Sequence, residues 1–205
     1  MSAASTATSV TVPTLTNGTS YTFTVAASNG SGKGAASAAS AAVTPEDTIF
    51  NFAAPTVLDS GDPNSVELGV KFTSSVSGSV TGIRFYKATT NTGTHIGSLW
   101  SSTGTLLSSA TFTNESASGW QFVTFSSPVA ITAGTTYVAG YFDPSGHYSE
   151  TEDGLVVGIE NPPLTALANG TSANGVYAYS STSTFPSSTW ESTNYSVDVL
   201  FAASP

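Results

Sequence analysis

Four side chains of the types that bind sugars occur close together in the sequence: Arg84, Tyr86, His95 and Trp100. An aromatic ring can stack on the apolar C–H face of a sugar, while charged and amide groups bond its hydroxyl groups. We therefore predict a ligand-binding surface formed by these four residues. The alternative is structural: Trp100 is then a buried core residue, Arg84 clamps a strand to a loop, and His95 donates to a turn.

The strands that must position these side chains follow from an alternating pattern. Apolar residues occupy every second position at Leu68, Val70 and Phe72, and again at Ile83 and Phe85. Such alternation is typical of strands with one buried face. The opposite face is predicted to meet solvent or a partner, and it carries Glu67, Gly69, Lys71, Arg84 and Tyr86.

A second group of side chains is acidic and suits a metal ion. Ca²⁺ takes six to eight oxygen ligands from carboxylates and carbonyls. By analogy with jelly-roll carbohydrate-binding modules, in which such an ion ties an N-terminal loop to the last strand, we predict a structural Ca²⁺ held by Asp59, Asp62, Asn64, Glu67 and Asp198. The alternative is that Asp59, Asp62 and Asn64 only shape turns through bonds from side chain to backbone.

Two further groups contain catalytic residue types without the motifs that catalysis needs. Asp143 and His147 flank a Pro-Ser-Gly turn, but no G-x-S-x-G or other nucleophile motif accompanies them. Glu150, Glu152 and Asp153 lie in one short stretch, whereas glycoside hydrolysis needs two opposed acids ~5–9 Å apart. We predict a loop-stabilising pair, a solvated acidic loop and no enzymatic activity.

Composition excludes several classes of partner. The formal net charge of −9 argues against nucleic acid and against an anionic membrane surface. No apolar run reaches the ~18 residues of a transmembrane helix, so membrane insertion is not expected. The chain has no cysteine, which removes disulfides and thiolate metal sites.

The choice of surface residues points to an extracellular protein. Charged residues make up 8% of the chain, compared with roughly 25% in an average soluble protein. Ser, Thr, Ala, Gly and Asn replace them, as is typical of extracellular bacterial β-modules. The first ten residues lack the basic and apolar regions of a signal peptide. We therefore expect a piece of a longer protein that is secreted or displayed on a bacterial surface.

The N-terminal quarter of the chain resembles the C-terminal half of a fibronectin type III domain. The signature L-x-x-G-T-x-Y-x-F-x-V runs from Leu15 to Val25, and two turns and a small-residue strand follow as far as Val43. The resemblance implies that the Tyr21 hydroxyl makes a tyrosine-corner bond. Because half a sandwich cannot bury its inner faces, we predict that residues 1–44 are poorly ordered or borrow a surface elsewhere.

After a linker at residues 45–47, the remaining residues 48–205 are predicted to form an all-β domain. Turn-forming clusters separate short runs with strand-like alternation, and no helical period exceeds two turns. Many short strands with polar turns favour an antiparallel β-sandwich or jelly roll. The expected strands are 48–52, 67–72, 78–86, 94–101, 106–112, 119–126, 135–141, 148–157, 175–179 and 195–202.

This second domain resembles a bacterial domain family of undetermined function, DUF4082. The segments that carry the likeness are IFNFAAP, DPNSVELGVKF, GIRFYK, NTGTHIGSLWSSTG, GWQFVTFSSPV, AGTTYVAGYFDPSGHYS and NYSVDVLF. The resemblance implies a non-catalytic β-sandwich module of a secreted multidomain protein, and it supplies no ligand.

We therefore predict an accessory module that binds carbohydrate or another cell-surface polymer, next to the other domains of its parent protein. The opposing hypothesis is a structural spacer without a ligand. Exposure of Tyr86 and Trp100 distinguishes the two, because a recognition surface requires ring faces that a ligand can reach.

Overall fold

The computed structural model describes residue 10 and residues 12–204, and it divides the chain into two compact units. One unit ends at Glu46 and the other begins at Asp47. The division therefore falls inside the linker expected at residues 45–47.

The first unit is an open two-stranded ribbon. Its tip pairs β1 (Ser28–Asn29) with β2 (Gly32–Lys33), and Tyr21 pairs with Val43 nearer the ends of its arms. Most of its described side chains are exposed. This exposure agrees with the expectation that the segment cannot bury an inner face by itself.

The hydroxyl of Tyr21 makes the predicted bond. It accepts the N–H of Thr16 at 3.0 Å, five residues earlier. The second unit repeats both the sequence and the bond, because LTNGTSY at residues 15–21 corresponds to ITAGTTY at residues 131–137. There the Tyr137 hydroxyl accepts the N–H of Thr132 at 3.1 Å. Each corner therefore fixes a tight turn by one side-chain bond.

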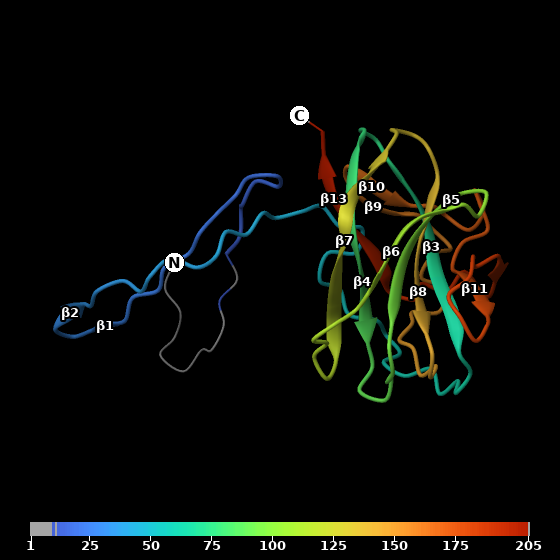
Figure 1. Ribbon diagram of the computed structural model, residues 1–205, viewed down its shortest axis with the longest axis horizontal. Helices are drawn as coiled ribbons and strands as arrows, with labels where there is room; N and C mark the ends of the chain where they lie inside the picture. The colour runs from blue at the N-terminus through green and yellow to red at the C-terminus, as the bar shows by residue number, and fades with distance from the viewer. Residues whose placement is uncertain (1–9, 11, 205) are drawn as a thin grey trace. The chain divides into compact units, whose positions relative to one another are not determined.

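The second unit consists of two antiparallel sheets (Figure 1). The larger sheet has eight strands in the order β12-β11-β3-β8-β5-β6, with β10 paired to β3 and β9 paired to β10. These strands are β3 (Val66–Ser74), β5 (Ile96–Ser101), β6 (Leu106–Thr111), β8 (Tyr137–Asp143), β9 (Ile159–Asn161), β10 (Leu164–Ala166), β11 (Val176–Tyr179) and β12 (Ser188–Thr189).

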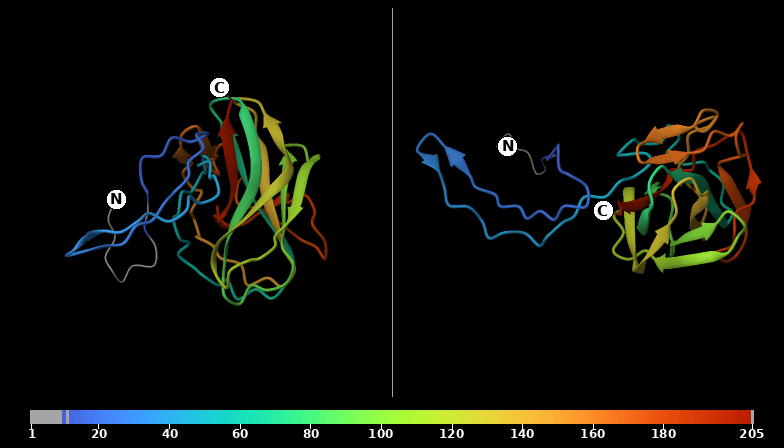
Figure 2. Two further views of the ribbon diagram at one scale, coloured as in Figure 1. Left: turned by 60° about the vertical axis from the view of Figure 1, so that its left-hand side comes forward. Right: turned by 90° about the horizontal axis from the view of Figure 1, so that it is seen from above.

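The smaller sheet has three strands in the order β13-β4-β7. They are β4 (Gly78–Lys87), β7 (Gly119–Ile131) and β13 (Val197–Ala203). Inward-facing residues of both sheets form one core that includes Leu68, Ile83, Tyr141 and Val199. The predicted all-β antiparallel sandwich is confirmed, and Figure 2 shows its strands surrounding this interior. The described residues contain no helix long and apolar enough to cross a membrane.

Two of the predicted strands are wrong. Residues 48–52 are not a strand, because the Asp198 carboxylate accepts the N–H groups of Ile49 and Phe50. Residues 148–157 form only isolated bridges at Glu150 and Thr151. In these segments, hydrogen bonds to side chains or isolated backbone bridges replace the continuous backbone hydrogen bonding of a strand.

The alternating pattern after Val66 predicts correctly which residues face the core. It does not predict how exposed the residues on the opposite face are. Leu68, Val70 and Phe72 face the core as expected. The outer face of β3 was predicted to meet solvent or a partner, yet Glu67 on this face is fully buried. A segment between β11 and β12, residues 183–186, covers it and is called the outer strap below.

The outer strap lies on a floor of small residues. Gly69 of β3 pairs with Gly140 of β8, and a Cβ atom at Gly69 would lie 3.1 Å from the ring of Pro186. The Thr184 N–H donates to Glu67 Oε2 at 3.3 Å. A larger side chain in place of Gly69 would therefore collide with the outer strap. The strap also buries the carboxyl of Glu67 beneath it.

Burial raises the pKa of Glu67 to about 8 from its ordinary value of 4.5. Its Oε1 atom has no hydrogen-bond partner among the described residues. A carboxyl in such a place is more stable neutral than ionised. Because the folded state then holds a proton that the unfolded state releases, the free energy of unfolding falls as pH rises from 4.5 to about 8.

The substitution Glu67→Gln should remove this loss of stability. At pH 5 the variant and the native chain should have similar melting temperatures, while at pH 9 the variant should be more stable by up to about 4 kcal/mol. Thermal unfolding followed by circular dichroism at both pH values measures the difference. An equal effect of the substitution at the two pH values would contradict a buried neutral Glu67.

Candidate functional site

Arg84 is the centre of a buried clamp and not a surface residue. It lies on the outer face of β4, as predicted, but residues 49–51 cover it and its exposure is 1%. Its Nη2 atom lies 2.6 Å from Asp198 Oδ2 on the paired strand β13 and also donates to the carbonyl of Asn51. The structure therefore corrects the predicted role of Arg84 to that of a clamp between strand and loop.

Tyr86 shares the outer face of β4 with Arg84, but it packs against a neighbouring aromatic ring. The Arg84 guanidinium lies 4.2 Å from the centre of the Trp120 ring, and Tyr86 meets the same indole edge-on at 5.7 Å. Tyr86 is half-buried. Only part of its ring is therefore accessible to a ligand.

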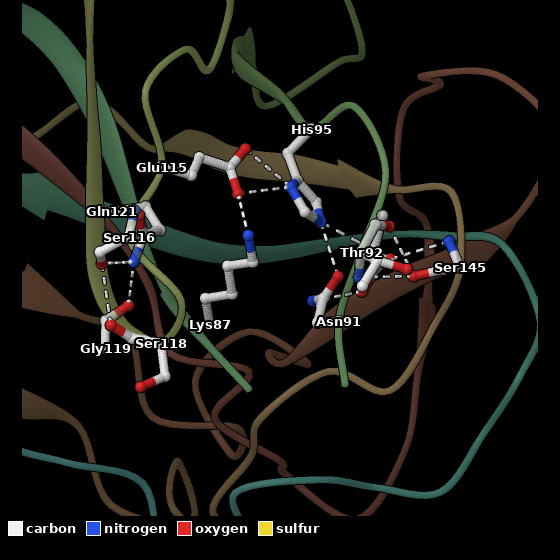
Figure 3. Close-up of polar contacts among 11 residues, drawn as sticks. Lys87, Asn91, Thr92, His95, Glu115, Ser116, Ser118, Gly119, Gln121 and Ser145 are labelled. Atoms are coloured by element: carbon white, nitrogen blue, oxygen red, sulfur yellow. Dashed lines mark hydrogen bonds and ion pairs between the residues drawn. The ribbon is translucent and has the colours of Figure 1, made fainter. Parts of the chain in front are cut away.

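His95 is fully buried and belongs to a chain of polar contacts (Figure 3). Lys87 Nζ lies 2.6 Å from Glu115, whose carboxylate oxygens lie 2.9 and 3.0 Å from His95 Nδ1. On the other side of the ring, Nε2 lies 2.6 Å from Asn91 Oδ1. Asn91 Nδ2 in turn donates to Asp143 at 2.7 Å.

Burial determines the ionisation of the side chains in this series of polar contacts. Burial lowers the pKa of His95, although Glu115 opposes the shift, and it raises the pKa of Asp143 to about 7. A neutral imidazole that donates to Glu115 must accept at Nε2. Which way the Asn91 amide is turned depends on the tautomer of His95, and in either orientation the amide bridges His95 and Asp143. The Ser145 hydroxyl adjoins the end of this series of contacts, since it lies 3.4 Å from Asp143 Oδ1, and it also donates to the carbonyl of Thr92 at 2.7 Å.

Trp100 is also removed from the predicted surface. It lies on the outer face of β5, opposite core-facing Leu99, and its exposure is 7%. Phe185 of the outer strap meets it edge-on, with ring centres 5.9 Å apart. The predicted binding set of Arg84, Tyr86, His95 and Trp100 therefore does not form one exposed face, because both sheets carry covering segments on their outer sides.

The predicted metal ligands are likewise separated. Asp59 accepts the N–H of Gly61 at 2.8 Å and the hydroxyl of Thr90 at 2.6 Å. Asp62 accepts the N–H and the side-chain amide of Asn64. These contacts are the turn-shaping bonds that were the alternative to a Ca²⁺ site.

The other two predicted ligands lie elsewhere in the fold. Glu67 lies under the outer strap, and both oxygens of Asp198 accept N–H groups, including that of Ile49 at 2.7 Å and the Arg84 guanidinium. Nothing in the described part of the chain brings three Asp, Glu or His residues into metal-binding geometry. The predicted set of five residues therefore does not fit a Ca²⁺ ion.

The two catalytic alternatives are also separated. Asp143 bonds to Asn91 as described above, while His147 Nδ1 lies 2.9 Å from Asp59. His147 thus stabilises a loop, as expected, but with a different acid. The pKa of Glu150 is raised by burial first and then by Glu152 and other nearby carboxylates. In the predicted acidic loop Glu152 and Asp153 are exposed, as expected, whereas Glu150 is half-buried.

The structure brings together a group of aromatic side chains that was not among the predicted site residues. A cavity of about 310 Å³ is lined by two apolar residues of β3 and by five aromatic residues, and we call it the aromatic cleft: Val66, Leu68, Tyr148, Tyr177, Tyr179, Trp190 and Tyr195. Trp190 is 59% exposed and Tyr179 is 57% exposed. Both rings are therefore available at the mouth of the cleft.

The cleft lies where the larger sheet extends beyond the smaller one. Tyr177 and Tyr179 pair with Leu68 and Val66, so they continue the inner face of the sheet onto β11. Tyr148, Trp190 and Tyr195, which complete the walls, lie outside the strands. The alternation of Tyr177 and Tyr179 was visible in the sequence, but the approach of the two loops was not.

The rings of the cleft stand at steep angles to one another. Tyr148 and Tyr195 are 5.5 Å apart at 83°, and Tyr177 and Tyr179 are 5.6 Å apart at 70°. An adjoining hollow of about 480 Å³ shares Tyr179 and is lined by Asn64, Ser65 and Ser180. The two hollows together provide ring faces, hydroxyls and an amide along one path.

A third hollow offers less open aromatic surface. It also measures about 310 Å³, and its aromatic walls are Phe50 and Trp120. Phe50 is buried and Trp120 is covered by the Arg84 guanidinium. The aromatic cleft is therefore the better candidate for ligand binding.

The substitution Asp198→Asn tests whether Asp198 serves an ion pair or a metal. Removing one charge of a buried pair should lower the free energy of unfolding by about 3–5 kcal/mol. Addition of EDTA or Ca²⁺ should leave the melting temperature of both proteins unchanged. A melting temperature of the native chain that falls in EDTA would contradict this assignment and restore the metal site.

Comparison with known proteins identifies the family of the second unit. No curated protein matches this chain. The family described as "Domain of unknown function (DUF4082)" matches residues 52–197, which include every strand of both sheets except β13, of which only Val197 is covered. The match leaves the first unit uncovered, so its likeness to a fibronectin type III domain stays a prediction. Since the match extends over more than half of the sequence, the chain belongs to the DUF4082 family.

Proposed function

We propose that the second unit is a non-catalytic module that binds carbohydrate in the aromatic cleft. The observation that carries this proposal is the exposure of Trp190 and Tyr179 beside a cavity walled by three more tyrosines. The predicted ligand class is thus kept, while its site moves from the outer face of β4 to the inner face of β11.

The chemistry of the cleft suits a sugar. Pyranose rings present apolar C–H faces, which pack on indole and phenol rings, and equatorial hydroxyls, which need donors and acceptors. Ligand pockets combine apolar walls with a few polar groups in the same way, and they start at about 300 Å³. The polar groups come from the tyrosine hydroxyls and from Asn64, Ser65 and Ser180 of the adjoining hollow.

The proposal of a non-catalytic role rests on the partners of the potential catalytic groups. Asp143 and His95 are joined through Asn91 inside a buried chain, and His147 is paired with Asp59. General acid–base catalysis needs a group within reach of the reacting atom. These side chains are occupied in contacts between loops.

The setting proposed for the module is a secreted multidomain bacterial protein, in which it acts beside other domains. The low content of charged residues and the abundance of Ser and Thr support an extracellular surface rich in hydroxyl groups. In that setting the module holds a neighbouring domain close to a polysaccharide or another surface glycan.

The substitutions Trp190→Ala and Tyr179→Ala should weaken binding without harming the fold. Each removes an exposed ring face, so retention on the polysaccharide to which the native chain binds should fall at least about tenfold. A glycan array followed by pull-down on insoluble polysaccharides identifies that ligand and measures the loss.

Phe122→Ala is the matched control, because Phe122 is 48% exposed on β7 and does not line the cleft. It should bind like the native chain. Melting temperatures of all variants should stay close to the native value. If the native chain is retained on no glycan or polymer, the binding proposal is wrong and a spacer role takes its place.

A further inference from the structure

Carboxylates at the rim of the aromatic cleft raise the pKa of its tyrosines. The Tyr179 hydroxyl donates to Asp62 at 2.5 Å, and this bond together with burial raises the pKa of Tyr179 to about 12. Burial is the main cause of the raised pKa of Tyr148 and Tyr195, and the negative charge of Glu150 adds to it in both. At least two acids therefore lie close to the walls of the cleft.

The carboxylates also repel one another. The pKa of Glu150 is raised by burial, then by Glu152, Asp62 and Glu191. Glu191 directly follows Trp190, the most exposed ring of the cleft. The Asp153 N–H donates to the carbonyl of Glu191 at 3.2 Å and Thr151 pairs with Asn194, so the acidic loop after Tyr148 lies against the loop that carries Trp190 at the mouth of the cleft.

The basic groups of the second unit are occupied elsewhere. Its three Lys and Arg residues are Lys71, Arg84 and Lys87. Arg84 pairs with Asp198, Lys87 pairs with Glu115, and Lys71 donates to Ser172. Across residues 47–204, none of the salt bridges involves Glu150, Glu152 or Glu191. These three glutamates therefore have no salt-bridge partner in the described second unit, whereas Asp62 lies near His147, which pairs with Asp59.

Aromatic faces and uncompensated carboxylates together recognise a cation. Ring faces attract an ammonium group through their quadrupoles, and a desolvated carboxylate adds a charge-assisted bond. A uronic acid or sulfated sugar would meet repulsion at the same rim. The steep angles between the rings make walls around a bound group, as the 74° between Tyr177 and Tyr195 illustrates.

From this charge complementarity we infer that the cleft selects polysaccharides whose sugars carry a free primary ammonium group. The inference rests on the proposed carbohydrate function and names its ligand class. The sugar ring packs on Trp190 and Tyr179, and its ammonium group lies between Glu150 and Glu191 at the rim.

Calorimetric titration of the whole chain with two hexamers tests the selection. A hexamer of glucosamine should bind at least about tenfold more tightly than a hexamer of N-acetylglucosamine at low salt, because only the first is charged. The ratio should shrink severalfold in 0.5 M NaCl, since rim charges are exposed to screening.

The double substitution Glu150→Gln and Glu191→Gln should abolish most of the preference and leave binding of the acetylated hexamer unchanged. Glu160→Gln is the matched control, because Glu160 is an exposed acid that lines a different hollow, the one walled by Phe50 and Trp120. Should the double variant fail to fold, the salt dependence of the native chain and competition by methylammonium give the same test.

The outcomes separate the two proposals. Equal affinity for both hexamers would overturn the selection of ammonium groups and leave the carbohydrate function standing. An equal loss of preference in the Glu160→Gln control would also overturn it, because the effect would then reflect net charge alone. Binding of neither hexamer nor any neutral glycan would overturn the proposed function and the selection together.

Discussion

The buried ion pair between Arg84 and Asp198 is the contact on which the second unit depends. Removing both charges from water is costly, and the cost is offset only when every donor and acceptor finds a partner. Asp198 accepts N–H groups from Ile49 and Phe50 as well as from Arg84, while Arg84 also donates to Asn51. The pair thus joins the last strand, β4 and the first segment of the unit.

This closure decides which surfaces remain available. Residues 49–51 cover Arg84 on the outer face of the smaller sheet, and the outer strap covers the central outer face of the larger one above Glu67 and Gly69. Exposed aromatic rings with a cavity between them occur at β11, where the inner face of the larger sheet continues past the smaller sheet. The location of the cleft follows from the unequal size of the two sheets.

Much of the fold could be predicted from the sequence because strand faces depend on local alternation. Leu68, Val70, Ile83 and Phe85 all face the core, and most of the strands lie where they were expected. The local pattern does not show which other segments of the chain cover the face of a strand. Arg84 and Trp100 were therefore assigned to solvent, although segments distant in the sequence cover them.

The cleft itself could not be predicted, because its walls come from four separate places in the chain. Tyr148, Tyr177, Trp190 and Tyr195 are isolated aromatics in sequence and become neighbours only when loops fold over β11. The acidic loop after Tyr148 was recognised as a cluster, but its position beside tyrosine rings depends on the same loop contacts. Composition gave the relevant hint, since a chain with so few basic residues leaves acids uncompensated.

The crystal structure of the chain with a bound oligosaccharide tests the central claim most directly. The account predicts a sugar ring on the faces of Trp190 and Tyr179, with Arg84 and Trp100 still covered by their segments. A sugar bound instead at Trp100, with the outer strap displaced, would contradict the account.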